Sequence, residues 1–466
     1  MRREPTLLWF LGGTGTVTGS RFLLDAAGGR VLVDAGLFQG LKRLRLRNRE
    51  EFPVDPATVD AVVVTHAHLD HIGYVPALVA QGFTGPVFVT DRTAELGQIV
   101  LDDAARLQEE EADFANRHGF SKHHPAQPLY TEADARRATT LFRPCPFDTS
   151  IEVAPGVRTE FRRAGHILGS AGVLLDVDGV GAGRIFVSGD VGRRDHPVLR
   201  PPVPPPAVDA LLVESTYGDR QHEEPEAAIE RLARAITRTA DRGGMIVIPA
   251  FAVDRTEIIL LALRELIHAG RIPSLPIYAD SPMALDVLTV YRRAIADRDD
   301  DVRLEPGAGD PFDPGLLHEA RTRDESIALN DLHVPSIIIS ASGMATGGRV
   351  VHHLARLLPD RRNTVVLAGF QAEGTRGRML ANKVPNLKML GRYVPVRSEI
   401  VVIDAFSAHA DADELAAWLK GAPAPPDTAY VVHGEQDASV AMAERLTRDL
   451  QWNTVVPRDG ERVVVG

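Results

Sequence analysis

The sequence predicts a layered α/β protein, and three observations support this fold class. Short β-branched runs alternate with segments of helical periodicity almost throughout the 466 residues, as expected where helices cover sheets. The chain is long for a single hydrophobic core, so two or three domains are expected. Hydrophobic residues make up 44% of it, which is ordinary for a globular protein and leaves enough apolar surface for such cores.

Strands are predicted at apolar β-branched runs in both halves of the chain. In order they are Arg30–Asp34, Ala61–Thr65, Pro86–Thr90, Arg184–Ser188, Ala210–Val213, Met245–Ile248, Ser336–Ser340, Thr364–Ala368, Ile400–Ala405 and Ala429–Val432. Helical spacing of apolar residues predicts helices between several of them, at Arg92–Arg117, Glu226–Arg242, Pro282–Ala296 and Arg349–Leu358.

Two proline-rich stretches mark the domain organisation. Arg200–Pro206 predicts a stiff extended connector before the Ala210 strand, and Ala422–Pro426 is a shorter one. These marks indicate a middle segment set into a domain that is built from both chain ends. We therefore expect a first domain part at residues 1–217, an inserted domain at 218–405, and the remainder of the first domain at 406–466.

Composition limits the cellular setting and the partners. A single cysteine, Cys145, excludes an intramolecular disulfide and a thiolate metal cluster. The apolar run after the N-terminal charges is too short for a signal peptide core, and no stretch is long enough to span a bilayer. A cytoplasmic protein with no membrane partner is expected. The net charge of -11 argues against a protein that coats itself in nucleic acid.

The run from Thr65 to His71 predicts a metal site. It places His66, His68, Asp70 and His71 directly after the apolar residues of the Ala61–Thr65 strand. In an extended segment His66 and His68 point to the same side, so both can reach one ion. The side chains of the neighbours Asp70 and His71 diverge and can face a second ion. Imidazole with carboxylate favours zinc or a similar transition metal.

Other strand ends supply the ligands that one loop lacks. His166 lies between glycines, Asp190 follows the Arg184–Ser188 strand and can bridge two ions, and His433 ends the Ala429–Val432 strand. With the first four residues they make a sensible ligand count for two ions. Asp34 also ends a strand, and we expect it to hydrogen-bond to a ligand rather than to bind metal itself.

The charge distribution indicates where a polyanion binds. Residues 340–400 carry ten basic and three acidic side chains on an acidic background. Within them, the glycine-rich turn around Ser342 and Gly343 lies between a predicted strand and a helix that begins near Arg349. Backbone N–H groups at such a helix start suit a phosphate, so Ser342, Gly343 and Arg349 are candidate phosphate-binding residues. A second basic run, Lys42–Arg47, fits either a substrate path or a solvated loop.

With these motifs in place, the sequence resembles a known superfamily. The order Asp34, His66-x-His68-x-Asp70-His71, His166 and Asp190 resembles metallo-β-lactamases, which implies a four-layer αββα sandwich with a dinuclear site. The segments around Glu214, Ser340–Arg349, Gly369–Thr375, His409 and His433 resemble the β-CASP subgroup, which carries an inserted α/β domain and processes nucleic acids. The likeness covers essentially the full chain. Within this subgroup, the sequence closely resembles the bacterial and archaeal ribonucleases that are related to the eukaryotic pre-mRNA 3′-end cleavage endonuclease.

The resemblance implies a zinc-dependent ribonuclease. Two Zn²⁺ ions, with Mn²⁺ as a substitute, would be held by His66, His68 and His166 and by Asp70, His71 and His433, with Asp190 bridging. A hydroxide activated by both metals would hydrolyse a phosphodiester of single-stranded RNA. His409 would be the general acid, and Glu214 would orient it and raise its pKa. Asp70, Glu214 and His409 are thus the expected catalytic residues, in a monomer or homodimer that cleaves as an endonuclease, a 5′ exonuclease or both.

Two alternatives remain at the level of sequence. A small-molecule hydrolase of the same fold, such as a thioesterase or lactonase, would share the motif from His66 to His71. The Glu214 and His409 pair and the long insertion argue against it. A non-catalytic RNA-binding subunit would be expected to lack ligands, whereas all seven are present.

Overall fold

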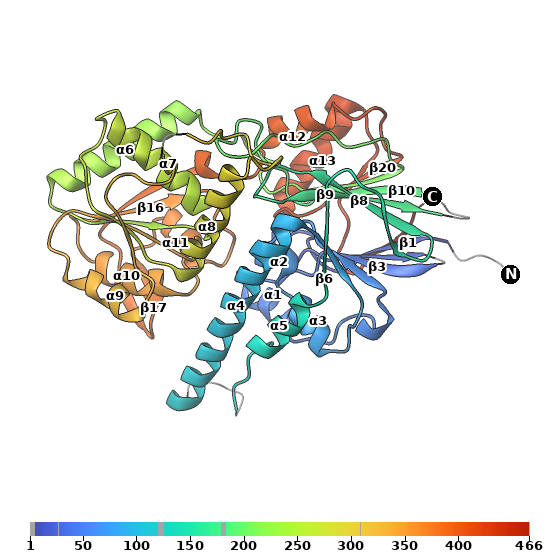
Figure 1. Ribbon diagram of the computed structural model, residues 1–466, viewed down its shortest axis with the longest axis horizontal. Helices are drawn as coiled ribbons and strands as arrows, with labels where there is room; N and C mark the ends of the chain where they lie inside the picture. The colour runs from blue at the N-terminus through green and yellow to red at the C-terminus, as the bar shows by residue number, and fades with distance from the viewer. Residues whose placement is uncertain (1–4, 27, 120–124, 179–182, 308, 466) are drawn as a thin grey trace. The chain divides into compact units, whose positions relative to one another are not determined.

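The computed structural model describes residues 5–26, 28–119, 125–178, 183–307 and 309–465. The chain forms two compact units (Figure 1). Unit 1 combines Met1–Gln221 with His409–Gly466, and unit 2 is His222–Ala408. The first unit is therefore assembled from both ends of the chain, and the second is a continuous insertion.

The first sheet of unit 1 is formed mainly by the N-terminal part of the chain. Its strands run in the order β22-β1-β2-β3-β4-β5-β6. Their bounds are β1 (Leu7–Phe10), β2 (Phe22–Ala26), β3 (Gly29–Val33), β4 (Ala61–Val63), β5 (Val87–Thr90), β6 (Phe142–Cys145) and β22 (Arg462–Val464). The strands from β3 to β6 pair in parallel, so their carboxyl ends lie along one edge.

The second sheet of unit 1 joins residues from both sides of the insertion. Its order is β21-β20-β11-β10-β9-β8-β7. The strands are β7 (Ile151–Ala154), β8 (Val157–Arg163), β9 (Ala171–Val177), β10 (Gly183–Val187), β11 (Ala210–Val213), β20 (Thr428–Val431) and β21 (Thr454–Val455). Because β10, β11 and β20 pair in parallel, they also end at a common edge.

Alternation along the strands sends the described apolar side chains of unit 1 either between the two sheets or to their outer faces. Val173 and Leu175 of β9 pack between the two sheets, whereas Leu174 faces the other way. The outer core of the first sheet packs against α3 (Val75–Ala80), α4 (Asp91–His118) and α5 (Glu132–Thr139). The outer core of the second packs against α12 (Ala412–Leu419) and α13 (Gln436–Leu450). The predicted four-layer αββα sandwich is confirmed (Figure 1).

Unit 2 contains a six-stranded parallel sheet in the order β14-β13-β15-β12-β16-β19. Its strands are β12 (Ile246–Pro249), β13 (Ile277–Ala279), β14 (Leu317–Glu319), β15 (Ile337–Ser340), β16 (Thr364–Ala368) and β19 (Glu399–Ile403). The helices are α6 (Pro225–Asp241), α7 (Arg255–His268), α8 (Pro282–Ala296), α9 (Arg323–Ala328), α10 (Arg349–Leu357) and α11 (Arg376–Ala381). A two-stranded hairpin, β17 (Asn386–Met389) and β18 (Arg392–Pro395), packs on the core of this unit.

The observed elements follow the local sequence signals closely. The longest helix, α4, begins where the Thr90 side chain accepts the Thr93 N–H, and it ends at Gly119 in the left-handed conformation. In α8 the Ser281 hydroxyl caps the start and Pro282 occupies the first turn, which gives the bounds that periodicity predicts. Two short helices, α1 (Lys42–Arg47) and α2 (Leu69–Ile72), lie in loops of unit 1. None of the described helices is both long and apolar enough to cross a membrane.

Candidate metal centre

Strand ends of both sheets in unit 1 bring seven potential ligands together. His66 and His68 follow β4, and α2 then presents Asp70 and His71 on its first turn. His166 lies between β8 and β9, while Asp190 follows β10 and His433 follows β20. Buried or half-buried side chains from four separate segments therefore meet at one edge of the sandwich.

The first ligand cluster consists of His66, His68, His166 and Asp190. His68 Nδ1 lies 3.1 Å from His66 Nε2 and 3.3 Å from His166 Nε2. Two nitrogens bound to one tetrahedral zinc at about 2.0–2.1 Å would lie roughly 3.3 Å apart. Asp190 Oδ2 completes the set at 3.5 Å from His66 Nε2 and 3.6 Å from His166 Nε2. The donor atoms and their spacing fit a zinc ion.

The second cluster consists of Asp70, His71 and His433. The Nε2 atoms of His71 and His433 are 3.1 Å apart, and Asp70 Oδ2 lies 3.9 Å from His433 Nε2. Asp190 Oδ1 is 3.3 Å from His71 Nε2, while Oδ2 of the same carboxylate faces the first cluster. The Asp190 carboxylate thus touches both clusters.

Burial keeps several of these imidazoles in the form that binds metal. It lowers the pKa of His68 to about 4, and it also holds the pKa values of His66 and His166 below the ordinary value. Neighbouring imidazoles add to the effect at His66 and His166, while the Asp190 carboxylate opposes it. A neutral imidazole offers a lone pair, so no proton need be displaced from these three ligands near neutral pH.

Asp34 belongs to neither cluster but hydrogen-bonds to a potential ligand, His71. Its buried carboxylate accepts the His71 Nδ1 proton at 2.6 Å, which aims His71 Nε2 at the cluster. The same carboxylate accepts the Thr65 N–H at 2.8 Å and lies 3.0 Å from the Thr65 hydroxyl. Burial disfavours charge on His71, but Asp190 and Asp34 outweigh it and raise the His71 pKa.

Thr65 is a residue that the sequence reasoning missed. Its Oγ1 lies 3.1 Å from His66 Nδ1 and 3.3 Å from His71 Nδ1, in addition to its contact with Asp34. The Thr65 hydroxyl therefore lies within hydrogen-bonding distance of one histidine from each cluster, on the Nδ1 side of both rings. Its place between a buried strand and the first histidine was the only sequence signal for this role.

Glu214 and His409 form a pair beside the clusters. His409 Nδ1 is 3.1 Å from Glu214 Oε1 and 3.9 Å from Asp190 Oδ2. The fully buried Glu214 also accepts the backbone N–H of Val191 at 2.8 Å and of Thr216 at 3.1 Å, which fixes its carboxylate. Burial opposes the charged form of His409, but Glu214 and Asp190 outweigh it and raise its pKa.

Glycines allow the backbone to pass close to the ligands. A Cβ on Gly36 would lie 1.6 Å from the carbonyl oxygen of Asp70. A Cβ on Gly192 would lie 1.7 Å from the carbonyl oxygen of Gly165, next to His166. Any side chain at either position would displace a ligand-bearing segment.

The predicted phosphate-binding residues belong to unit 2. Ser342 Oγ accepts the Thr346 N–H at 3.2 Å, and a Cβ on Gly343 would meet the Phe251 ring. The Arg349 guanidinium donates to Asp280 Oδ1 at 2.7 Å and to the carbonyl oxygens of residues 320 and 321. Arg349 therefore has an internal structural role, and phosphate binding by these three residues stays a prediction.

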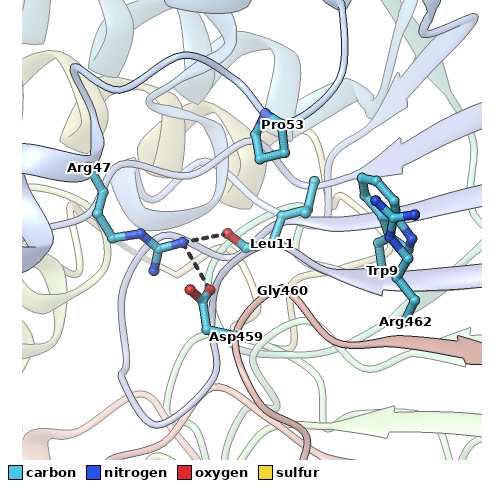
Figure 2. Close-up of a pocket in the computed structure, with 7 residues that line it drawn as sticks. All are labelled: Trp9, Leu11, Arg47, Pro53, Asp459, Gly460 and Arg462. Atoms are coloured by element: carbon cyan, nitrogen blue, oxygen red, sulfur yellow. Dashed lines mark hydrogen bonds and ion pairs between the residues drawn. The ribbon is translucent and has the colours of Figure 1, made fainter.

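The basic run Lys42–Arg47 forms helix α1 rather than a loop. Its last residue, Arg47, pairs with Asp459 at 2.9 Å and donates to the Leu11 carbonyl at 3.2 Å. These groups line a small pocket of about 180 Å³ outside both ligand clusters (Figure 2). On the opposite side of this pocket, the Arg462 guanidinium lies over the Trp9 ring. Arg47 is thus anchored, while Lys42, Arg43 and Arg45 are exposed.

Family models match most of the chain. The model of the metallo-beta-lactamase superfamily covers residues 15–235, and the Beta-Casp domain model covers residues 256–380. A third, the Zn-dependent metallo-hydrolase RNA specificity domain, covers residues 393–457 and includes His409 and His433. The insertion recognised in the sequence is therefore a β-CASP domain.

Relatives of known name extend over nearly the whole chain. A protein named as a ribonuclease from Thermus thermophilus is 38% identical over 93% of this chain and 94% of its own length. An RNase J-like protein from Methanocaldococcus jannaschii is 32% identical over 97% of this chain and 98% of its own length. A protein named transcription termination factor FttA, from the same organism, is 30% identical over 98% of this chain and 71% of its own length.

Among solved structures, a protein of unknown function from Enterococcus faecalis has a TM-score of 0.50 at 14% identity. It spans 99% of this chain and 100% of that chain, and supports the fold alone. The family models and the close relatives show more. The chain belongs to the metallo-β-lactamase superfamily of metal-dependent hydrolases, in its β-CASP branch.

Proposed function

We propose that this protein is a ribonuclease that hydrolyses phosphodiester bonds of single-stranded RNA with two zinc ions. The observation that carries the proposal is the Glu214–His409 pair beside two ligand clusters, both of which the Asp190 carboxylate contacts. Hydrolysis of a phosphodiester requires an activated water and a proton for the leaving oxygen. The site offers groups for both tasks within a few ångströms.

His66, His68 and His166 would hold one ion, and Asp70, His71 and His433 the other, with Asp190 between them. Zinc bound there would supply Lewis acidity, which lowers the pKa of water and offsets negative charge on a phosphate. Asp34 and Thr65 keep the imidazoles of His66 and His71 in the required orientation.

The proton for the leaving oxygen comes from His409 in this account. Glu214 holds Nδ1 of His409, so the opposite ring nitrogen, Nε2, is the atom that can donate. The raised pKa favours the protonated form of this imidazole, which is the form that a general acid needs. Its side chain is 15% exposed, whereas that of Glu214 is inaccessible to solvent. The acid can therefore meet a substrate, and Glu214 acts through it.

RNA is the substrate class that the comparisons favour. The Thermus relative is named a ribonuclease, and the RNA specificity domain model spans both His409 and His433. A small thioester or lactone would need neither that domain nor the 187-residue insertion between Gln221 and His409. The small-molecule alternative is therefore not favoured.

A metal titration tests both the activity and the number of ions. Protein stripped by a chelator is given zinc in increasing molar ratio, and cleavage of labelled single-stranded RNA is followed at each step. We expect activity to rise up to the second equivalent, because each ligand cluster would take one ion and the activation of water and the stabilisation of phosphate charge would need both. Full activity at one equivalent would contradict the two-ion site, and no cleavage at any ratio would contradict the ribonuclease.

A further inference from the structure

We propose that the β17–β18 hairpin of unit 2 is a docking surface for single-stranded RNA, separate from the metal-binding residues. The proposal rests on the ribonuclease function proposed above and names a place where the substrate is held. Three observations carry it: the charge of the surrounding segment, an exposed aromatic ring, and the rigid geometry of the hairpin.

The segment that contains the hairpin is strongly basic. Residues 374–398 contain six Arg and Lys side chains and no Asp or Glu, in a chain of net charge -11. Lys383, Lys388 and Arg392 are exposed, and among the described residues their side chains have no hydrogen-bond or ion-pair partner. Charges that stabilise no part of the fold remain available for phosphates.

Tyr393 is the most exposed large hydrophobic side chain of the described residues, at 72%. It pairs across the hairpin with Lys388, so the ring and the ammonium group share one face. On the opposite face Leu387, Met389 and Val394 are buried in the core of unit 2. An aromatic ring beside a cation on the outer face is the arrangement that stacks bases and tracks a phosphate backbone in single strands.

The hairpin holds this face in a fixed geometry. Leu390 and Gly391 form its two-residue turn, with φ values of 49° and 77°, as a tight hairpin turn requires. Arg376 of α11 ties the hairpin to the unit by donating to the carbonyl oxygen of Lys388 at 3.0 Å. A preordered surface binds a flexible strand at a lower entropic cost than a mobile loop would.

Exposed apolar side chains such as Tyr393 and Leu390 can also mark a surface that binds a second copy of the same chain. Leu390 at the turn is 51% exposed. However, the charged residues of the segment 374–398, which contains both side chains, are all cationic, and two such segments would repel each other in a symmetric dimer. The charge therefore favours a polyanion over a like surface.

The experiment compares RNA with a small phosphodiester in the zinc-loaded full chain. The test variant is Lys388→Glu/Arg392→Glu, and the control is Arg234→Glu/Arg323→Glu, which makes the same charge change at exposed positions of the same unit. We expect the test variant to raise KM for a long single-stranded RNA about tenfold, with kcat unchanged. The slope of log Kd against log salt should fall by about 1.4, because two phosphates would no longer be neutralised by the protein.

Hydrolysis of bis(p-nitrophenyl) phosphate, which needs only the metal centre, should be equal in all variants. Tyr393→Ala should weaken RNA binding about tenfold, while Tyr393→Phe should keep the affinity, because stacking needs the ring and not the hydroxyl. Because Tyr393 is exposed, both variants are expected to fold.

The outcomes separate this proposal from the function beneath it. If the wild type cleaves RNA but the test and control variants bind it equally, the hairpin proposal fails and the ribonuclease stands. If the test variants change the mass in sedimentation and leave RNA binding intact, the surface is a protein interface and the proposal is overturned. If the wild type neither binds nor cleaves RNA, the proposed function itself fails.

Discussion

At the scale of single residues, Asp190 and His409 occupy different places in the site, and we propose different tasks for them. Asp190 touches both ligand clusters, and each of its oxygens faces a different pair of imidazoles. His409 lies beside the clusters and is held by Glu214. Substitution of Asp190 should therefore affect metal content, and substitution of His409 should affect proton transfer.

His409→Gln should keep the zinc content of the wild type and lose about 10²- to 10⁴-fold in RNA cleavage, the usual contribution of a general acid. His433→Ala should instead lose metal, because His433 Nε2 faces His71 and Asp70. Zinc analysis and single-turnover cleavage, measured on the same samples, distinguish the two. Equal zinc loss in both variants would refute the assigned roles.

The pH dependence of cleavage tests the Glu214 contact. A general acid must be protonated, so the rate falls as pH rises through the pKa of His409. Burial lowers this pKa, and Glu214 raises it together with Asp190. Glu214→Gln removes the negative charge and should shift the alkaline limb of the kcat/KM profile to lower pH. An unshifted limb would assign the proton donor to another group.

Asp34→Asn tests the support beneath the ligands. The asparagine keeps the shape and tolerates the left-handed backbone at this position, where φ is 60°, but it lacks the charge that faces His71 Nδ1. Zinc affinity in competition with a chelator should fall about 10- to 100-fold. Wild-type affinity would mean that the orientation of His71 does not depend on this carboxylate.

At the scale of elements, the sequence could indicate which proposed ligands lie together, because most of them follow a strand of recognisable pattern. Parallel strands β10, β11 and β20 end at one edge, so Asp190, Glu214 and His433 had to lie close together. Thr65 escaped prediction because threonine at a strand end carries no specific signal. The role of Arg349 also escaped, since its partner Asp280 is 69 residues away and only the folded sheet joins them.

Arg349 therefore offers a test of two roles for one side chain. As an internal support for the inaccessible Asp280, its loss in Arg349→Ala should lower the unfolding free energy by about 2 kcal/mol. The exposed Arg361→Ala serves as control. Thermal denaturation reports the stability, and KM for RNA reports phosphate binding. Unchanged stability with a raised KM would favour the phosphate role that the sequence suggested.

A substitution at Gly36 tests whether the close approach of the backbone at Gly36 to Asp70 is needed for metal binding. Gly36→Ala should displace α2 and weaken zinc binding, because the added methyl group overlaps the Asp70 carbonyl. Gly307→Ala is the control, as its Cβ would meet nothing within 4 Å. Zinc titration of both variants should show weaker binding only in the first. Wild-type zinc affinity in both variants would show that α2 can shift to make room for the methyl group without weakening zinc binding.

At the scale of the whole molecule, the two units have separate hydrophobic cores, and among the described residues only unit 1 contains the ligand clusters. Zinc bound at a thousand times its Kd would stabilise unit 1 by about 4 kcal/mol. A chelator should therefore lower the melting transition of unit 1 and leave that of unit 2 in place. Calorimetry with and without chelator measures this, and an equal shift of both transitions would show that the units unfold together.

The proposed ribonuclease activity is tested most directly by giving the zinc-loaded protein two substrates in parallel, a labelled single-stranded RNA and a small thioester. We predict that the RNA is cleaved, that a chelator or His409→Gln abolishes cleavage, and that the thioester is left intact. Intact RNA together with a hydrolysed thioester would rule out the ribonuclease, because the same ligand clusters would then serve a small-molecule hydrolase.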